Sequence, residues 1–396
     1  MLTSLITHAL TRNSDLAAAT IRVRRAQLQA EQADSDHLPS LSVGGSNAQT
    51  RTLTDGGKQT RSYAVSATFN YEQDLWGKLG SSYDAARWEA EATEEDRAST
   101  AQVLIGTTAS LYWQIAYLNE RIDVSGASVA YAEQTLELAR LRLAAGAATA
   151  LEILEAERSL AQEEADQTTL VQQRVEARNA LAILFDGPPQ GLSATEPAGF
   201  SRAKLPEVAT GLPAELLARR PDLRAAEARL RATLAANDAS RASLYPTMSL
   251  SGSLGGSSED LARLLSSPLA TLTTDLALPL VQWHDIQRNI KLSETEYQEA
   301  VLTFRKTLYS ALAEVENSLS ARQQYKLQEE KLVLALHAAR KTEELYKIRY
   351  QAGGSQLASW LDAQENRRQA EIAVAENRLN QLQNHITLCK ALGGGA

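Results

Sequence analysis

Apolar residues recur along much of this chain at the spacing of coiled-coil helices. One seam, with steps of three and four residues, contains Ile372, Ala375, Leu379, Leu382, Ile386 and Cys389. A second seam has one extra step of four, which changes the supercoil locally, and contains Tyr297, Val301, Phe304, Leu308, Leu312, Val315 and Leu319. We therefore expect long helices that pack against one another as coiled coils.

Other segments alternate with a period of two, which is the pattern of a strand with one apolar face. The clearest covers residues 63–71, where aromatic and aliphatic side chains alternate with small or polar ones. A second covers residues 272–280, and weaker alternation surrounds Leu41 and Met248. The sequence thus predicts four strands of about 9–12 residues, close to the length that a tilted strand needs to cross a bilayer.

The chain repeats itself at a constant offset of 207 residues. Matching positions include Pro39 and Pro246, Trp76 and Trp283, Arg142 and Arg349, Gly146 and Gly353, and Leu154 and Leu361. We divide the chain into a first structural repeat at residues 1–189, a linker at 190–209 and a second repeat at 210–396. Each repeat is expected to hold a helix that ends before its X-Pro pair, two strands and a helical hairpin.

The helical hairpins are expected to be long. Residues 76–146 and 283–353 would each extend about 105 Å if they were wholly helical. A break is expected near Ser125-Gly126, because serine and glycine are both weak helix formers. The hairpin turns should consist of the small residues Ala145-Gly146-Ala147 and Ala352-Gly353-Gly354.

Composition and charge narrow the function classes. A net charge of −8 argues against a nucleic-acid partner. The single cysteine, Cys389, excludes an intrachain disulfide, and the five histidines show no metal-ligand spacing. No nucleotide-binding or nucleophile motif occurs, so we expect no cofactor, no metal and no enzyme activity.

The chain has no run of 18 apolar residues, and residues 1–5 lack the basic and apolar segments of a signal peptide. Taken alone, that start favours a cytosolic protein. One hypothesis is therefore a soluble helical coiled-coil scaffold. It accounts for the helices and leaves the four strands without a purpose.

The other hypothesis is a membrane channel built from several copies. Four strands cannot close a barrel, and open strand edges promote aggregation. Copies that pool their strands would remove the edges, and three copies would supply 12 strands. The sequence alone does not fix the number three.

Three segments resemble those of TolC-like outer-membrane factors, the channels of tripartite efflux pumps: Phe69–Lys78, Gly211–Asp222 and Leu361-Asp362-Ala363-Gln364. The resemblance covers essentially the whole chain. It implies a mostly α fold with membrane β-strands, in which a homotrimer forms a 12-stranded barrel continued by an α-helical periplasmic tunnel. It also implies a passive exit duct for drugs or other small molecules in the bacterial outer membrane. A periplasmic adaptor would connect the duct to an inner-membrane pump, and an export signal would lie outside this chain.

Three sets of site residues follow. The expected lipid-facing residues are Tyr63, Val65, Phe69 and Tyr71. The adaptor is expected to dock on Ala145, Gly146, Ala147, Ala352, Gly353 and Gly354, although the glycines could instead serve only as helix caps. The expected pore gate consists of Asp362, Ser359, Arg349 and Glu365.

Within that gate, Asp362 matches the family's pore-lining aspartate, and three copies of it would form an acidic ring that attracts cations. Ser359 would face the same lumen, and Arg349 is the candidate ion-pair partner that holds the helices inward. Glu365 stands where the family can carry a basic residue, so this chain departs from a family-type latch. The alternative is that Asp362 is an ordinary exposed carboxylate.

Overall fold

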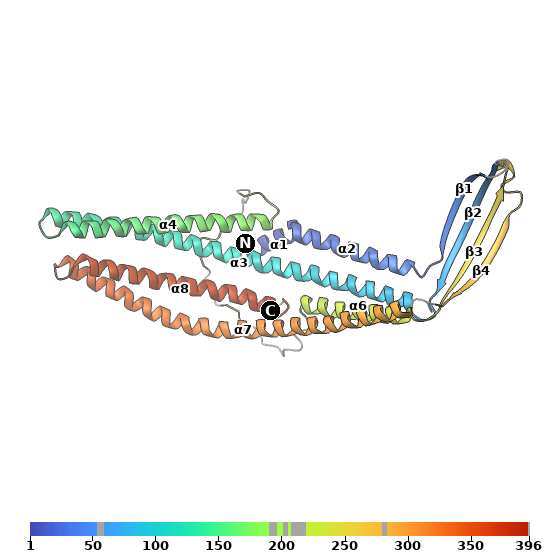
Figure 1. Cartoon of the computed structure of the whole chain (residues 1–396). Coiled ribbons are helices and arrows are strands. Elements are labelled where there is room, and N and C mark those ends of the chain that lie inside the picture. Colours follow the sequence, from blue (N-terminus) through green and yellow to red (C-terminus); the bar gives the residue numbers. More distant parts are fainter. Residues whose placement is uncertain (54–58, 190–195, 201–204, 207–218, 279–282, 395–396) are drawn as a thin grey trace. The chain divides into compact units, whose positions relative to one another are not determined.

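The chain is described by a computed structural model, which covers residues 1–53, 59–189, 196–200, 205–206, 219–278 and 283–394 (Figure 1). The helices are α1 (Leu2–Arg12), α2 (Ser14–Ser35), α3 (Lys78–Ala144), α4 (Ala150–Leu184), α6 (Pro221–Ala242), α7 (Trp283–Gln351) and α8 (Leu357–Ala391). The strands are β1 (Ser40–Arg51), β2 (Gln59–Gln73), β3 (Thr247–Ser258) and β4 (Leu269–Ala277), and a short 3-10 turn, η1, covers Leu261–Arg263. The predicted long hairpins and the four strands are confirmed, with β4 at 269–277 in place of the predicted 272–280, of which residues 279–280 lie outside the described residues. Most of the predicted linker and residues 211–218 of the family-like segment lie outside the described residues.

The single helix expected at the start of the chain is divided in two, because Asn13 separates α1 from α2. Its side-chain Oδ1 accepts a hydrogen bond from the backbone N–H of Leu16 at 3.0 Å, as at a helix N-terminus. Its Nδ2 donates to the backbone oxygen of Leu184 at 3.1 Å, which ties the break to the end of α4. Both α2 and α6 end before their X-Pro pair, as predicted.

The expected break at Ser125-Gly126 is wrong, since α3 is one continuous helix of 67 residues. Ser125 is buried, and a methyl group at Gly126 would lie 3.5 Å from the side-chain nitrogen of Gln167 on α4. A helical glycine costs only about 1 kcal/mol relative to alanine. Packing between α3 and α4 outweighs that propensity. No helix in the described ranges includes an 18-residue stretch apolar enough to cross a membrane.

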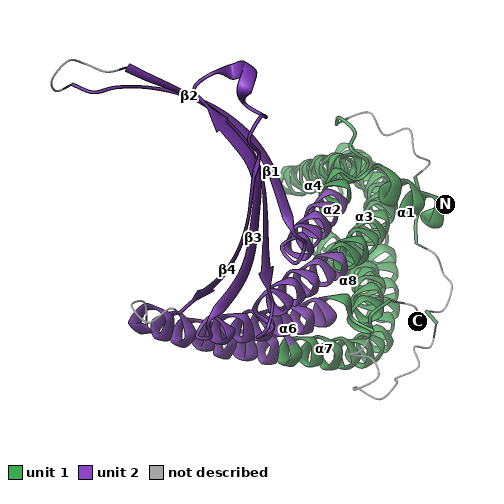
Figure 2. Cartoon of the chain, turned by 90° about the vertical axis from the view of Figure 1, so that its right-hand side faces the viewer, with its two compact units in different colours: residues 1–19, 97–221, 308–396 green, residues 20–96, 222–307 purple. Residues whose placement is uncertain are grey.

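The chain divides into two compact units, and each takes segments from both halves of the sequence (Figure 2). We call residues 1–19, 97–221 and 308–396 the helical unit, and residues 20–96 and 222–307 the sheet unit. The sheet unit holds one antiparallel sheet in the order β1-β2-β3-β4, so β1 and β4 are its edges.

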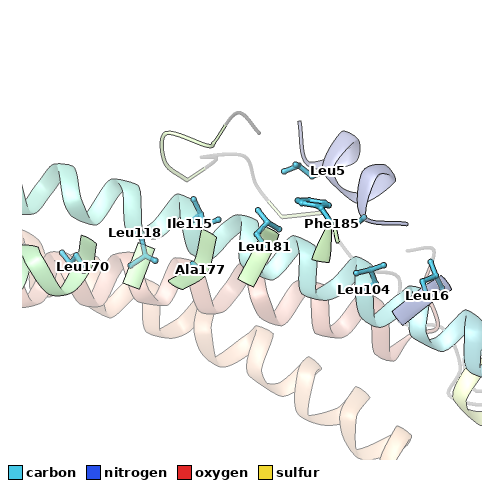
Figure 3. Close-up of a cluster of buried hydrophobic side chains, with 10 residues drawn as sticks. Leu5, Leu16, Leu104, Ile115, Leu118, Leu170, Ala177, Leu181 and Phe185 are labelled. Atoms are coloured by element: carbon cyan, nitrogen blue, oxygen red, sulfur yellow. The ribbon is translucent and has the colours of Figure 1, made fainter. Parts of the chain in front are cut away.

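A continuous apolar core joins α1, the start of α2, α3 and α4 within the helical unit (Figure 3). Its labelled members are Leu5, Leu16, Leu104, Ile115, Leu118, Leu170, Ala177, Leu181 and Phe185. Burying a leucine or phenylalanine side chain contributes about 1.5–3 kcal/mol. This packing holds the first hairpin together.

Candidate functional site

The sheet has one apolar face and one polar face that continue across all four strands. Residues paired directly across neighbouring strands point to the same side of a sheet. Phe69 is paired with Leu41 on β1 and with Gly252 on β3, and Gly252 is paired with Leu272 on β4. The residues that we call the apolar face are Leu41, Val43, Tyr63, Val65, Phe69, Tyr71, Met248, Leu250, Leu254, Leu272 and Leu276.

The opposite face carries serine, threonine, glycine and asparagine at nearly every position. Its members include Ser40, Ser42, Ser66, Thr68, Asn70, Ser249, Ser251, Ser253, Thr271, Thr273 and Asp275. The aliphatic side chains of the apolar face on β1 and β4 are largely exposed in the single chain. An exposed apolar surface of this extent is typical of a membrane or subunit contact. The sheet thus brings the four residues predicted to face lipid together on one side.

Trp76 fixes the junction between the sheet and the helices of the sheet unit. Its indole Nε1 donates to the backbone oxygen of Pro246 at 2.8 Å, and its ring stacks on Tyr245 with centroids 4.8 Å apart. Asp74 accepts from the backbone N–H of Gly80 at 2.8 Å at the start of α3. The sequence marked Trp76 by its repetition and could not identify these partners, which lie 170 residues away.

The two hairpin turns have the same backbone geometry. Gly146 and Gly353 have φ angles of 72° and 74°, in the left-handed region. The N–H groups of Ala147 and Gly354 each donate at 2.8 Å to the carbonyl five residues earlier, which closes a Schellman cap. Both glycines therefore cap helices, and all six residues of the two turns are exposed. Adaptor docking on them stays a prediction.

Near these turns, a cluster of buried and half-buried side chains joins the two hairpins of the helical unit. The Arg142 guanidinium lies over the Tyr350 ring, 4.3 Å from its centroid, and donates to the Tyr350 backbone oxygen. The Tyr350 hydroxyl donates to Glu152 Oε2 on α4 at 3.0 Å. Burial, together with this acceptor, raises the pKa of Tyr350 to about 12. Trp360 on α8 is buried against the same ring, with centroids 5.4 Å apart.

The sequence analysis missed this cluster. Arg142 and Arg349 occupy equivalent repeat positions, yet Arg142 makes the contact between hairpins and Arg349 is exposed. The signal that could have found it is the aromatic pair Tyr350 and Trp360, which has no aromatic counterpart in the first repeat.

The predicted gate residues lie on the second hairpin. Asp362 is exposed and Ser359 is half-buried, both on α8. Across the described part of one chain, no ion pair joins Arg349 to Asp362. Glu365 is engaged elsewhere, because it pairs with Arg368 and accepts from Gln369 Nε2 at 2.7 Å.

Arg368 connects α8 to α4 through a cluster of carboxylates. Its guanidinium lies 2.9 Å from Glu163 and 2.7 Å from Asp166, and it also pairs with Glu365. Burial raises the pKa of Glu163, and the positive charge of Arg368 opposes that rise. The cluster offers a second charged connection between the hairpins.

The family model for outer membrane efflux proteins matches this chain twice, at residues 5–185 and 212–394. The pyoverdine export outer membrane protein OpmQ of Pseudomonas putida is 33% identical over 404 residues, which span 100% of this chain and 86% of that protein. Outer membrane protein OprJ of Pseudomonas aeruginosa is 30% identical over 399 residues, which span 99% of this chain and 83% of OprJ.

A solved structure shows the same arrangement. The open-state MtrE outer membrane channel of Neisseria gonorrhoeae superposes with a TM-score of 0.87 at 30% identity, covering 100% of this chain and 89% of MtrE. The helices and strands described above are thus those of a solved channel over nearly its full length.

Proposed function

The chain belongs to the outer membrane efflux protein family and is an outer-membrane efflux channel, and from this premise we propose how its residues form the exit duct. The predicted family, function and location in the outer membrane and periplasm are confirmed, and the soluble scaffold is set aside. Among the relatives, OpmQ is an export outer membrane protein and TtgC of Pseudomonas putida is a probable efflux pump outer membrane protein, so this chain works with other pump components.

The assembled form of the duct is a homotrimer. Three four-stranded sheets close a 12-stranded barrel, which leaves no open edge on β1 or β4. The apolar face then lies outward against outer-membrane lipid, with Tyr63, Val65, Phe69 and Tyr71 in the lipid layer. The serine- and threonine-rich face lines the water-filled lumen. The continuous apolar face is the observation that carries this proposal.

The helical hairpins form the periplasmic tunnel, and their turns contact the adaptor. Ala145, Gly146 and Ala147 carry no bulky side chain and are exposed, as are Ala352, Gly353 and Gly354. A partner's backbone can approach closely at such turns. The adaptor in turn connects the duct to an inner-membrane pump that supplies the energy.

The gate lies at the same end of the hairpins. Three copies of Asp362, with Ser359 beside it, form an acidic constriction around the threefold axis. Arg349 pairs with a carboxylate of a neighbouring copy, and the Arg142–Tyr350–Glu152 cluster holds the hairpins of one chain together. Glu365 acts through Arg368 and does not serve as a latch.

Substitution on either face of β2 tests the barrel. Phe69→Arg places a charge on the apolar face and should cost about 2–4 kcal/mol near the bilayer midplane, so trimers extracted from outer membranes are lost. Thr68→Arg is the matched control, because Thr68 neighbours Phe69 and points to the polar face. Equal trimer yield from both variants would contradict the assignment of faces.

A further inference from the structure

The repeat offset holds in the strand register as well as in the sequence. Subtracting 207 from both residues of any β3–β4 pair gives a β1–β2 pair. Such related pairs are Thr247 with Ala277 and Ser40 with Asn70. Each hairpin is therefore equivalent to the other, residue for residue. The β2–β3 joint connects the two hairpins and occurs once in the chain.

We propose that the contact between copies repeats the β2–β3 joint, so that β4 of one copy pairs with β1 of the next in a register set by the duplication. This inference rests on the proposed trimer and specifies its interface. In this joint each strand is replaced by its equivalent in the other repeat. β4 replaces β2, which adds 207 to each residue number, and β1 of the next copy replaces β3, which subtracts 207. Tyr63 with Ser258 thus becomes Ala270 with Arg51 of the neighbouring copy, and Asn70 with Ser251 becomes Ala277 with Gly44 of that copy.

This register keeps the two faces of the sheet continuous. Leu272 and Leu276, on the apolar face of β4, are placed opposite Gln49 and Gly45, which lie on the same side of β1 as Leu41. A slip by one residue would put the polar face of one copy beside the apolar face of the next. Slips by two residues preserve the faces, so the neighbouring helices must exclude them.

The helices of the sheet unit supply that second constraint. On α6, Arg229 pairs with Asp96 and lies 3.6 Å from Glu89 of α3. The repeat equivalent of Arg229 is Arg22 of α2, and the repeat equivalent of Glu89 is Glu296 of α7. Arginine and glutamate recur at both positions, and Arg22 and Glu296 are both exposed. Their pairing between copies would reproduce the Arg229–Glu89 contact, whereas Asp96 has the uncharged Thr303 as its equivalent.

The exposure of Ile21 also indicates that this face of α2 contacts a neighbouring copy. It is 71% exposed, whereas its repeat equivalent, Ala228 on α6, is 4% exposed. Ala228 lies one turn from Arg224 and close to Arg231, and these two side chains contact Glu95 and Trp88 of α3. Among the described residues of its own chain, nothing covers Ile21 to a comparable extent. Contact with α7 of the next copy would cover Ile21.

Trp283 adds a contact at the end of the strands. Its equivalent, Trp76, bonds to the Pro246 carbonyl and stacks on Tyr245. One repeat on, the corresponding partners are Pro39 and Leu38 of the neighbouring copy. Trp283 is 44% exposed and Leu38 is exposed in the single chain. Both side chains are therefore accessible for the contact that the duplication specifies.

At Ala48 the proposed joint between copies differs from the β2–β3 joint. A methyl group on its counterpart, Gly255, would lie 2.5 Å from the backbone oxygen of Val65. Ala48 carries that methyl group, and in the same geometry it would meet the backbone oxygen of Leu272 of the neighbouring copy, which is the equivalent of Val65. The joint between copies must therefore be less tightly curved at this position than the β2–β3 joint.

Cysteine cross-linking of the full chain in outer membranes tests the register, in a Cys389→Ser background that removes the native thiol. The pair Asn47→Cys and Thr274→Cys is directly opposed in the proposed register and should form disulfides that link copies into trimers. The control pair, Val43→Cys and Thr274→Cys, is displaced by four residues and should stay uncrosslinked. Trimers that cross-link only through the control pair would overturn the register and leave the channel intact. Absence of any oligomer would instead overturn the proposed trimer.

Charge reversal tests the helix contact independently. Arg22→Glu or Glu296→Arg alone should raise the monomer fraction severalfold at a fixed detergent concentration, and the double reversal should restore the trimer. Glu31→Arg is the control, because its repeat equivalent, Asp238, is exposed on α6 and so lies outside the contact that the duplication repeats. If the single variants have the monomer fraction of the wild type, or if the double variant fails to restore the trimer, the Arg22–Glu296 contact is contradicted.

Discussion

The Arg142 guanidinium lies 4.3 Å from the centroid of the Tyr350 ring, and this contact joins the end of α3 to the end of α7. Arg142 also supplies the carbonyl that closes the cap at Gly146, so the contact is built into the turn of the first hairpin. A cation over an aromatic ring contributes about 0.5–2 kcal/mol, more when desolvated. The two hairpins of one chain are thereby held together beside their turns.

Removing the hydroxyl of Tyr350 should loosen this contact without removing the ring. Tyr350→Phe loses the hydrogen bond to Glu152, which should cost about 1 kcal/mol and raise the resting conductance of the reconstituted channel. Tyr346→Phe, at a half-buried tyrosine one turn earlier on α7, is the matched control. Unchanged conductance in Tyr350→Phe would show that the hydroxyl does not restrain opening.

The apolar core of the helical unit should dominate its stability. Leu118 is 2% exposed and Leu141, on the same helix, is 61% exposed. Leu118→Ala should cost about 2–5 kcal/mol, and Leu141→Ala should change the free energy of unfolding by less than about 0.5 kcal/mol. Denaturant unfolding followed by circular dichroism measures both. Similar losses in the two variants would contradict the assigned core.

His385 should make stability depend on pH. Burial, and then the charge of Arg322, lowers its pKa below 6.5. Its folded pKa is depressed, so its contribution to stability is fully present above pH 6.5 and is lost as the pH falls through the folded-state pKa. His385→Gln should therefore flatten the acid side of a profile of unfolding midpoint against pH. A profile with the same acid slope in the variant would exclude this histidine as its cause.

The hairpin turns allow docking to be separated from helix capping. Gly146→Asn keeps a residue that tolerates the left-handed conformation, and no atom lies within 4 Å of its added Cβ. The trimer should therefore form normally, while the new side chain hinders the adaptor and reduces efflux of a fluorescent substrate at least severalfold. Gly146→Val, which strains the cap, controls for loss of the turn itself. Normal efflux with Gly146→Asn would count against docking at this turn.

Much of the fold could be predicted, because its signals are local or repeated. Alternation at residues 63–71 marked β2, and the offset of 207 residues located the equivalent turns at Gly146 and Gly353. The break at Asn13 and the continuity of α3 at Gly126 were not predictable, because each depends on packing against α4.

The contacts within the site were harder to predict for the same reason. The partners of Trp76 lie about 170 residues away along the chain, and Arg142 reaches a carbonyl 208 residues away. The repeat offset alone does not show whether Arg142 or its equivalent, Arg349, makes the contact. Neighbours of different sequence decide which arginine makes the contact: Tyr350 beside Arg142 has Leu143 as its counterpart.

Single-channel recording in planar lipid bilayers tests the central claim most directly. The purified trimer should give discrete, cation-selective conductance steps without nucleotide, because the account describes a passive duct with an acidic ring at Asp362. Asp362→Ala should reduce the preference for cations, and Arg349→Ala should raise the resting conductance. Trimers that carry no current, even in Arg349→Ala, would contradict the claim that this chain forms the exit duct.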